Sequence, residues 1–382
     1  MRLPQEIVAL TSAALGQVLA ADILADLDSP PFTKALMDGY AVQAADLMQG
    51  PIELNILEEV QAGAMPMKSI GPGDAIGVYT GAPVPVGTDA VVMKERCEVL
   101  PNGKVRVHDT SLRPGKSVLD RGAEMRSGET VLRQGTVISP NAFGLFASVG
   151  KTAVPAYPRA KVGVLATGDE LVEANMKPKD AQIRNSNGPM LVAQSVRAGA
   201  LPRYLGIARD DETTLKSMIR EGLTTTNILV LAGGVSAGKF DLVPSVLESL
   251  GVTIRFHKVR MKPGKPMLFG TKGDVLVFGL PGNPVSANVG FELFVRPAIR
   301  KLSGHAEPGT MMRKMPLNQP LMANNDRPTY QPARLQHDAV QPLPWLGSAD
   351  LRALLNADAL IALPVGTIDL AAGAMVDVIP MG

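Results

Sequence analysis

The sequence has very few of the residues that build disulfides and soft-metal centres. Cys97 is the only cysteine, which excludes an intrachain disulfide and a cysteine-rich metal site and is typical of a reducing compartment. The four histidines lie far apart, and no two have the i, i+4 spacing that would place both imidazoles on one helix face. We therefore do not expect a zinc site built from cysteine or histidine.

Long apolar runs and an excess of one charge are also missing. No segment offers about 18 uninterrupted apolar residues, and the N-terminal segment has no basic stretch followed by an apolar core. The 38 basic and 36 acidic residues nearly cancel, which removes the overall field that attracts nucleic acids or anionic membranes. We therefore expect a cytoplasmic protein with no nucleic-acid or membrane partner, in which any anion site is local.

Several domains are expected from length and composition. At 382 residues with 46% apolar content, the chain is long enough for more than one domain, because single cores stop growing well below this length. The 38 glycines and 31 prolines, with only 4% aromatic residues, predict tight turns between short strands and several small lobes.

The first part of the chain changes pattern twice. Apolar positions between residues 5 and 24 recur at roughly helical spacing, which predicts one helix that ends before Pro30 and Pro31. From about residue 50 to 110 the sequence pattern is typical of strands, with apolar runs such as Ile76–Tyr79 and Ala90–Met93 between turns rich in Gly and Pro. This part predicts a small β domain.

Residues 160–305 alternate between apolar strands and helical stretches. The expected strands are Lys161–Ala166, Asn227–Ala232 and Val275–Gly279, and the expected helices are Asp211–Leu223, Leu242–Leu250 and Pro284–Leu302. Such alternation predicts a parallel, doubly wound sheet with helices on both faces, whose ligands bind beyond the carboxyl ends of the strands. Residues 306–382 return to short strands, including Ala359–Leu363 and Met375–Ile379, and predict a separate β domain.

A glycine-rich loop follows the strand at Ile228–Leu231. Its sequence, AGGVSAGKFD at 232–241, leads into a helix, and three glycines let backbone N–H groups approach an anion at the helix N-terminus. The glycines support a phosphate cradle and a ligand-free tight turn about equally. Asp241 is either a helix cap or part of the site.

A cluster of cations follows, with prolines fixing its backbone. The cations are Lys258, Arg260, Lys262 and Lys265, within the segment KVRMKPGKP. A charge run is usually a solvated surface, but this stiff segment is favoured as a site for a doubly charged oxyanion or phosphate. The turn VFGLPGNP at 277–284 is either a rigid ligand-free turn or a wall of the same pocket.

Carboxylates stand near the expected ends of the strands. Glu170 follows the strand at 162–165, and Asp210 precedes a helix, where a helix cap is the better-supported role for Asp210 taken alone. Several acids beside a cationic pocket suit a magnesium-assisted phosphoryl reaction, because the metal bridges carboxylate and phosphate.

The order of the motifs along the chain resembles the molybdopterin molybdenumtransferase family, which includes MoeA and the E domain of gephyrin. The matching segments are SPPFTKALMDGYAV at 29–42, TGAPVPVGTDAVVMKE at 80–95, ATGDELV at 166–172, IRNSNGPML at 183–191, GGVSAGKFD at 233–241, MKPGKP at 261–266 and GLPGNPVSANVGFELFVRPAIRKLSG at 279–304. Weaker similarity continues through 347–366. Each segment alone is a weak signal for the family, but the whole set in this order is specific to it.

This resemblance implies an α/β multidomain fold. The implied parts are an elongated linker domain (6–24 and 129–159), an inserted β domain (25–128), a doubly wound MogA-like α/β molybdopterin-binding domain (160–305) and a C-terminal β-barrel-like domain (306–382). It also implies an elongated homodimer whose active site lies at the subunit interface, where the α/β domain of one subunit faces the inserted β domain and the C-terminal domain of the other.

The family reaction is implied as well. Adenylylated molybdopterin is cleaved with Mg²⁺, molybdate is inserted into the dithiolene, and AMP is released. A molybdopterin adenylyltransferase and molybdoenzyme chaperones would be further partners, before and after this step. Molybdate is a tetrahedral dianion, so lysine, arginine and hydroxyl groups suit it independently of the resemblance.

The resemblance also assigns residues. Catalytic roles fall on Asp38, Thr80, Glu170, Asp210 and Asp241, with Glu170 and Asp241 as the metal ligands. Pterin, phosphate and oxyanion binding fall on Ser236, Lys258, Lys262, Lys265, Pro281, Pro284, Arg327 and Ser348.

Four departures from the family pattern keep two other functions open. Thr33 and Lys34 replace an acidic and a polar position, Glu124 replaces an aspartate, and Lys239 reverses a charge beside the predicted metal. The changes at Thr33, Lys34 and Lys239 favour, as one alternative, a catalytically impaired member that acts as a binding or scaffold protein. The other alternative is a nucleotide enzyme like the molybdopterin adenylyltransferases, which the α/β domain alone resembles.

Overall fold

The structure is a computed structural model that describes residues 2–48, 51–109, 111–235 and 242–381. The chain forms two compact units, which are described separately. Unit 1 comprises Met1–Ala20, Gly135–Ser139 and Ala153–Gly382, and unit 2 comprises Ala21–Gln134 and Pro140–Thr152. Of the predicted site residues, Ser236 and Asp241 lie outside the described residues, as does Lys239.

A six-stranded sheet forms the centre of unit 1. Its strands, in spatial order, are β17 (Leu201–Ala208), β14 (Lys161–Thr167), β18 (Ile228–Ala232), β21 (Val275–Leu280), β20 (Leu268–Lys272) and β19 (Thr253–His257). The pairs from β17 to β21 are parallel, whereas β20 runs antiparallel to both β21 and β19. The expectation of an all-parallel sheet is therefore wrong at this edge. The cause is the two-residue turn at 273–274, which joins β20 directly to β21, whereas a parallel pair needs a long crossover.

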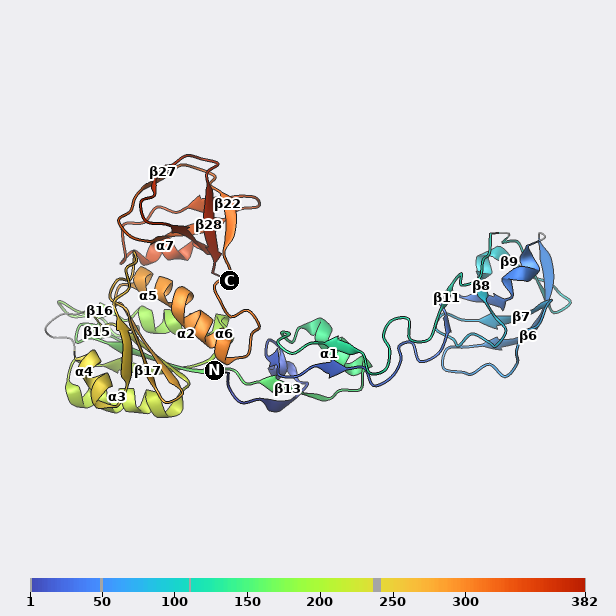
Figure 1. Ribbon diagram of the computed structural model, residues 1–382, viewed down its shortest axis with the longest axis horizontal. Helices are drawn as coiled ribbons and strands as arrows, with labels where there is room; N and C mark the ends of the chain where they lie inside the picture. The colour runs from blue at the N-terminus through green and yellow to red at the C-terminus, as the bar shows by residue number, and fades with distance from the viewer. Residues whose placement is uncertain (1, 49–50, 110, 236–241, 382) are drawn as a thin grey trace. The chain divides into compact units, whose positions relative to one another are not determined.

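Helices cover both faces of this sheet, as predicted (Figure 1). One face carries α2 (Asn187–Arg197), α5 (Pro284–Gly290), a π-helical turn (Phe291–Val295) and α6 (Arg296–Leu302), and the other carries α3 (Glu212–Thr225) and α4 (Val243–Ser249). Strand β18 shows why both faces are filled. Ile228 and Val230 belong to one buried cluster and Leu229 and Leu231 to the other, as the two-residue period of a strand requires. Each of these side chains contributes roughly 1.5–3 kcal/mol by its burial.

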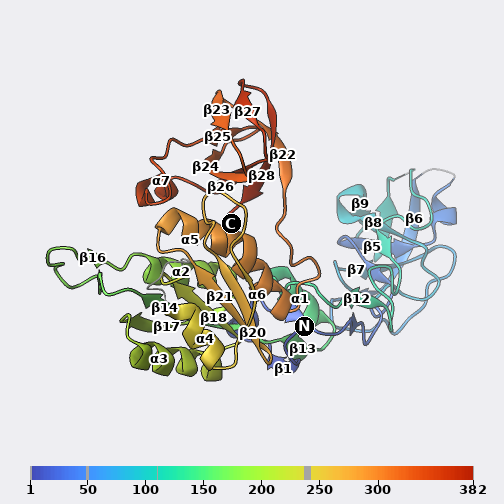
Figure 2. The same cartoon turned by 60° about the vertical axis from the view of Figure 1, so that its left-hand side comes forward.

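A β-rich region ends the chain and packs on α5 (Figure 2). It contains the sheet β22 (Arg313–Pro316), β28 (Met375–Pro380), β26 (Ala359–Leu363), β24 (Thr329–Leu335) and β25 (Val340–Pro342), the pair β23 (Leu321–Asn324) and β27 (Ile368–Leu370), and helix α7 (Leu351–Leu355). Leu360 and Ile379 of its sheet are buried together with Val285 and Val289 of α5 and with Met261. This apolar contact fixes the basic segment 258–265 against the C-terminal sheet.

The predicted helix over residues 5–24 is wrong. The segment forms β1 (Glu6–Ala9), a 3₁₀ turn (Ser12–Ala14), β2 (Val18–Leu19) and β3 (Ile23–Leu24). In unit 1, β1 and β2 pair with the two sides of β13 (Ala153–Tyr157). Ile7 is 73% exposed whereas Val18 is fully buried, so the apolar positions that suggested a helix do not share one buried face.

Unit 2 is built around a second six-stranded sheet. Its strands, in spatial order, are β8 (Ala90–Met93), β5 (Gly39–Val42), β7 (Asp74–Val78), β6 (Ile52–Val60), β10 (Lys104–Val107) and β9 (Cys97–Val99). Smaller elements are the pairs β11 (Val118–Leu119) with β4 (Lys34–Ala35) and β12 (Thr130–Leu132) with β3, the 3₁₀ turns Ala44–Leu47 and Lys94–Arg96, and helix α1 (Pro140–Ser148). The strands predicted near Ile76 and Ala90 are confirmed.

No helix in the described part of the chain is both long enough and apolar enough to cross a membrane.

Candidate active site

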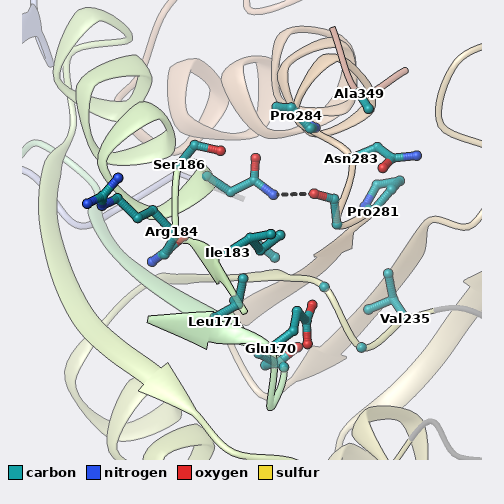
Figure 3. A pocket seen from close by; sticks show the side chains of 18 of the residues that line it. Glu170, Leu171, Ile183, Arg184, Ser186, Val235, Pro281, Asn283, Pro284 and Ala349 are labelled. Carbon is teal, nitrogen blue, oxygen red and sulfur yellow. Dashed lines mark hydrogen bonds between the residues drawn. The ribbon is translucent and has the colours of Figure 1, made fainter. Parts of the chain in front are cut away.

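The carboxyl ends of β14, β18 and β21 open into a cavity of about 780 Å³ in unit 1. Its wall includes Thr167, Gly168, Glu170, Leu171, Ile183, Arg184, Asn185, Ser186, Asn187, Asp210, Gly233, Gly234, Val235, Pro266, Pro281, Asn283, Pro284 and Ala349. Figure 3 shows Glu170 at its lower end, Pro284 and Ala349 at its upper end, and Ser186 across the space from Pro281. The cavity lies where a doubly wound sheet is expected to bind its ligand.

Two of the predicted acids, Glu170 and Asp210, share this cavity. Burial raises the pKa of Asp210, and the nearby charges of Asp169 and Glu170 raise it further. The expectation that Asp210 caps the next helix is wrong, because the side chain of Asp211 accepts the backbone N–H of Thr214, at 2.8 Å. Asp210 therefore stands on the cavity wall beside like charges, an arrangement that a bound cation would stabilise.

The described part of the glycine-rich loop packs closely on the end of β14. At Gly234, where φ is +61°, an added Cβ would lie 2.6 Å from the Thr167 hydroxyl oxygen, so a side chain would clash there. The following carbonyl, on Val235, lies 2.9 Å from Nε2 of His257. Because a carbonyl only accepts hydrogen bonds, His257 must donate from Nε2. The loop is thus fixed on both sides just before residue 236.

A second cavity, of about 500 Å³, contains most of the predicted oxyanion site. Lys262, Lys265, Arg327 and Ser348 all line it. The basic segment is hydrogen-bonded to the C-terminal sheet, because Lys262 donates its N–H to the Pro328 carbonyl and accepts the N–H of Tyr330, both at 2.8 Å. These bonds hold the cation-bearing backbone in place before a ligand binds.

The two cavities adjoin. Pro266, Pro281 and Asn283 line both of them, and Asn283 Nδ2 donates to the Ser348 hydroxyl at 2.8 Å. Both predicted prolines stand on the PGNP turn at residues 281–284. Pro281 lines both cavities, and Pro284 lines the first.

Lys258 is placed differently from the other lysines. It does not line either of these two cavities, and it stands at the start of the basic segment with a φ of +104° and its N–H donated to the Met267 carbonyl at 2.7 Å. The structure therefore brings Lys262 and Lys265 together with Arg327 and Ser348 but does not bring Lys258 to the same space.

Asp38 and Thr80 meet in unit 2. The Asp38 carboxylate accepts the Thr80 backbone N–H at 2.8 Å and its hydroxyl at 2.7 Å, and the Lys94 ammonium lies 3.5 Å away. These hydrogen bonds, with the lysine charge, lower the pKa of Asp38. The neighbouring Gly39 is required because a Cβ there would overlap the Val92 carbonyl of the adjacent strand.

Two of the departures from the family pattern are joined by an ion pair. The Glu124 carboxylate accepts the Ser29 hydroxyl at 2.7 Å and the Lys34 ammonium at 3.3 Å, and both bonds lower its pKa. Thr33 accepts the Arg121 N–H through its hydroxyl at 3.3 Å. Three of the four substituted positions, Thr33, Lys34 and Glu124, therefore each have a local polar partner.

Some residues of the first cavity were not predicted from the sequence. Asn185 and Asn187, in the segment IRNSNGPML, line it, as does Thr167, and His257 holds the loop beside it. The available signal was a run of polar residues directly before a helix at the sheet's carboxyl edge, where polar groups converge on ligands. Within the described residues, no three His, Cys, Asp or Glu side chains are close enough to hold a metal ion without other ligands.

Three family models match the chain in succession. "MoeA N-terminal region (domain I and II)" matches residues 1–150, "Probable molybdopterin binding domain" matches 163–301, and "MoeA C-terminal region (domain IV)" matches 314–381. Together they span nearly the whole sequence in the order that the motifs predict.

Individual relatives agree with these models. A Bacillus subtilis protein named molybdopterin molybdenumtransferase is 34% identical over 376 residues, covering 96% of this chain and 87% of the relative. Molybdopterin molybdenumtransferase 2 of Mycobacterium tuberculosis is 33% identical, covering 99% and 96%. The crystal structure of a molybdopterin biosynthesis MoeA protein from Pyrococcus horikoshii matches with a TM-score of 0.84 and 30% identity, covering 100% of this chain and 95% of that one. The chain therefore belongs to the MoeA family, the molybdopterin molybdenumtransferases of molybdenum cofactor biosynthesis.

Proposed function

We propose that this chain inserts molybdate into the dithiolene of adenylylated molybdopterin and releases AMP. The observation that carries the proposal is the pair of adjoining cavities, one with the Glu170 and Asp210 carboxylates on its wall and the other with lysine and arginine side chains. A substrate that joins a nucleotide to a pterin and must meet an oxyanion needs two such neighbouring environments.

The second cavity suits molybdate. Molybdate is a tetrahedral dianion with hard oxygen atoms, and ammonium, guanidinium and hydroxyl groups bind such anions by charge-assisted hydrogen bonds. Lys262, Lys265, Arg327 and Ser348 offer these groups on one cavity wall. Because the basic segment is already fixed to the C-terminal sheet, ordering it on binding costs little entropy.

The first cavity suits magnesium. Mg²⁺ prefers carboxylate oxygens and usually keeps several waters, so one or two carboxylates are enough to hold it beside a phosphate. Glu170 and Asp210 supply such oxygens, and the pKa of Asp210 is raised first by its burial and then by the nearby charges of Asp169 and Glu170. We assign Glu170 as one ligand, together with Asp241 from the segment outside the described residues. When bound, the ion would neutralise charge on the phosphate oxygens.

The proposed reaction balances without an oxidant or reductant. Water cleaves the bond between the adenylate and the pterin phosphate, which gives AMP and free molybdopterin. The two S–H groups of the dithiolene then replace one oxo group of molybdate, which leaves as water. In this scheme the lysines and Arg327 hold the oxyanion, while the walls at Pro281 and Pro284 position the pterin phosphate.

We further propose that the active unit is a cytoplasmic homodimer. Every described residue that lines either cavity belongs to unit 1, whereas Asp38 and Thr80 lie in unit 2. In the proposed dimer, Asp38 and Thr80 of one subunit complete the site of the other. A molybdopterin adenylyltransferase would supply the substrate, and molybdoenzyme chaperones would receive the product.

The test is an AMP-release assay. Purified protein with adenylylated molybdopterin and Mg²⁺ should release AMP only when molybdate is added. No molybdate-dependent release would overturn the proposal in favour of a scaffold role. Consumption of ATP without molybdate would favour the adenylyltransferase-like alternative.

A charge-matched pair of variants sharpens this assay. Lys265→Gln should raise the molybdate concentration needed for half-maximal release about tenfold, because it removes one charge-assisted contact worth roughly 1.5 kcal/mol. Lys272→Gln, at the exposed end of β20, removes the same charge away from both cavities and should leave that concentration unchanged. Equal effects of the two variants would show that Lys265 acts only through the overall charge.

A further inference from the structure

Two polar atoms buried on the wall of the first cavity have no hydrogen-bond partner among the residues that the structure describes. They are the hydroxyl oxygen of Thr167 and the amide oxygen Oδ1 of Asn187, and these residues are only 2% and 8% exposed. An unpartnered buried polar atom lowers stability, so native proteins keep few of them, and each one calls for an explanation. Two such atoms on one cavity wall point to a ligand that supplies the missing partners.

The amide of Asn187 has a defined orientation. Its Nδ2 donates to the Gly282 carbonyl at 2.7 Å, the bond dashed in Figure 3, which ties α2 to the PGNP turn. A rotated amide would set two oxygens against each other, so Oδ1 must be the atom left without a partner. This oxygen can only accept a hydrogen bond, and the matching ligand group must be a donor.

The neighbouring Asn185 shows the contrast. It lines the same cavity, but its Nδ2 donates to the Tyr204 hydroxyl at 2.8 Å and its Oδ1 accepts the Gly188 N–H at 2.9 Å. Both ends of Asn185 therefore serve the fold, whereas one end of Asn187 does not. The Thr167 hydroxyl also has no partner within the described part of the chain, and Gly234 packs against it.

We infer that Thr167 and Asn187 bind an uncharged part of the substrate through its N–H or O–H groups. The inference rests on the proposed function, because it concerns the same cavity. Ionised phosphate and molybdate oxygens donate no hydrogen bonds and so cannot satisfy Asn187 Oδ1. The donors that can do so are ring N–H or amino groups of the pterin or the adenine, or the ribose hydroxyls. The part of the first cavity at Thr167 and Asn187 thus contacts neutral groups, whereas the proposed metal site and the second cavity hold the phosphate and molybdate groups.

Isothermal titration of the full-length protein with AMP and, separately, with 6-hydroxymethylpterin tests this division. Thr167→Val removes only the hydroxyl and should weaken the binding of one of the two probes about 5- to 30-fold, the usual effect of one lost hydrogen bond. Thr167→Ser keeps the hydroxyl and should bind like the wild type. The probe that loses affinity identifies whether the nucleotide or the pterin contacts Thr167; since this hydroxyl can donate as well as accept, the donor group is assigned only if Asn187→Ala weakens the same probe.

Stability separates this role from a structural one. Because the Thr167 hydroxyl has no partner in the unliganded protein, Thr167→Val should melt at the wild-type temperature or above it while binding more weakly. Asn187→Ala should weaken the same probe, with some loss of stability from the broken Gly282 bond. Affinities of Thr167→Val and Asn187→Ala within twofold of the wild type for both probes, or no wild-type binding of either, would overturn the inference. Since binding is measured without molybdate or metal, failed AMP release with intact binding differences would overturn only the proposed function.

Discussion

Unit 1 and unit 2 hold their predicted catalytic aspartates in opposite ways. In unit 2, Asp38 accepts two hydrogen bonds from Thr80 and has a lysine nearby, and its pKa is lowered. In unit 1, Asp210 is partly buried beside Asp169 and Glu170, and its pKa is raised. The same side chain is thus stabilised as an anion in one region and destabilised as an anion in the other.

This difference separates two chemical roles. Asp38 already has its counter-charge and its hydrogen-bond donors, so it is suited to hold Thr80 in one orientation. Asp210 forms no ion pair within the described residues and would be stabilised by a cation that shares the cavity with Glu170. The carboxylates of unit 1, rather than those of unit 2, are therefore where a metal should matter most.

Removing the unit 1 carboxylates should give the largest effect. Glu170→Gln should reduce molybdate-dependent AMP release at least about 100-fold, a loss of roughly 3 kcal/mol of transition-state stabilisation. Glu212→Gln, in the exposed first turn of α3, removes the same charge outside the cavity and serves as the control. Raising the Mg²⁺ concentration should partly restore Glu170→Gln, and a variant as active as the wild type would remove Glu170 from the metal site.

The pH dependence of stability should differ in sign between the two aspartates. Because the folded-state pKa of Asp38 is lowered, its charged form stabilises the fold above the unfolded pKa, and this contribution is lost as the pH falls through the folded pKa. Asp38→Asn should therefore lower the melting temperature at pH 7, and the difference should shrink in acid.

For Asp210 the raised pKa reverses the expectation. Its charged form disfavours folding at pH values above the folded pKa, and this penalty fades as the pH falls toward the ordinary aspartate value. Asp210→Asn should raise the melting temperature at pH 7 and converge with the wild type in acid. Differential scanning calorimetry of both variants across this range is the measurement, and shifts of the same sign would remove the contrast between the units.

Much of the site could be predicted from the sequence because its residues follow strands. Parallel strands place their following loops at one edge of a sheet, so the order of strands and loops along the chain is enough to bring Glu170, Asp210 and Pro281 together. The roles of these residues stay predictions, as do the four domain boundaries. Periodicity also identified β14, β18 and β21 and the helices α3, α4, α5 and α6, because their buried positions recur without interruption, but it did not identify α2.

The parts that were missed depend on long-range contacts. The spacing of apolar residues at 5–24 fits a helix, but pairing with β13, far along the chain, decides the strand conformation of β1 and β2. The direction of β20 depends on a short turn, and the unpartnered state of Asn187 Oδ1 depends on which carbonyl its amide meets. Lys258 was grouped with the other lysines by its place in the basic segment and by the family resemblance, neither of which registers its positive φ.

The smallest effect is expected at the ion pair that distinguishes unit 2 from the family pattern. The Lys34 and Glu124 side chains are 27% and 47% exposed, so their pairing should be worth only about 0.2–1 kcal/mol in a double-mutant cycle of Lys34→Gln and Glu124→Gln. Raising the ionic strength should weaken this coupling, because the pair is open to solvent.

The same variants decide whether this pair has replaced a catalytic function. If Glu124 only anchors Ser29 and Lys34, both single variants should release AMP within about threefold of the wild-type rate, since a solvent-exposed pair adds little to a transition state in another unit. A much larger loss in Glu124→Gln than in Lys34→Gln would show that the carboxylate itself takes part in the reaction. In that case unit 2 would also supply a chemically active acid. The assignment of unit 2 carboxylates to a positioning role would then apply to Asp38 only.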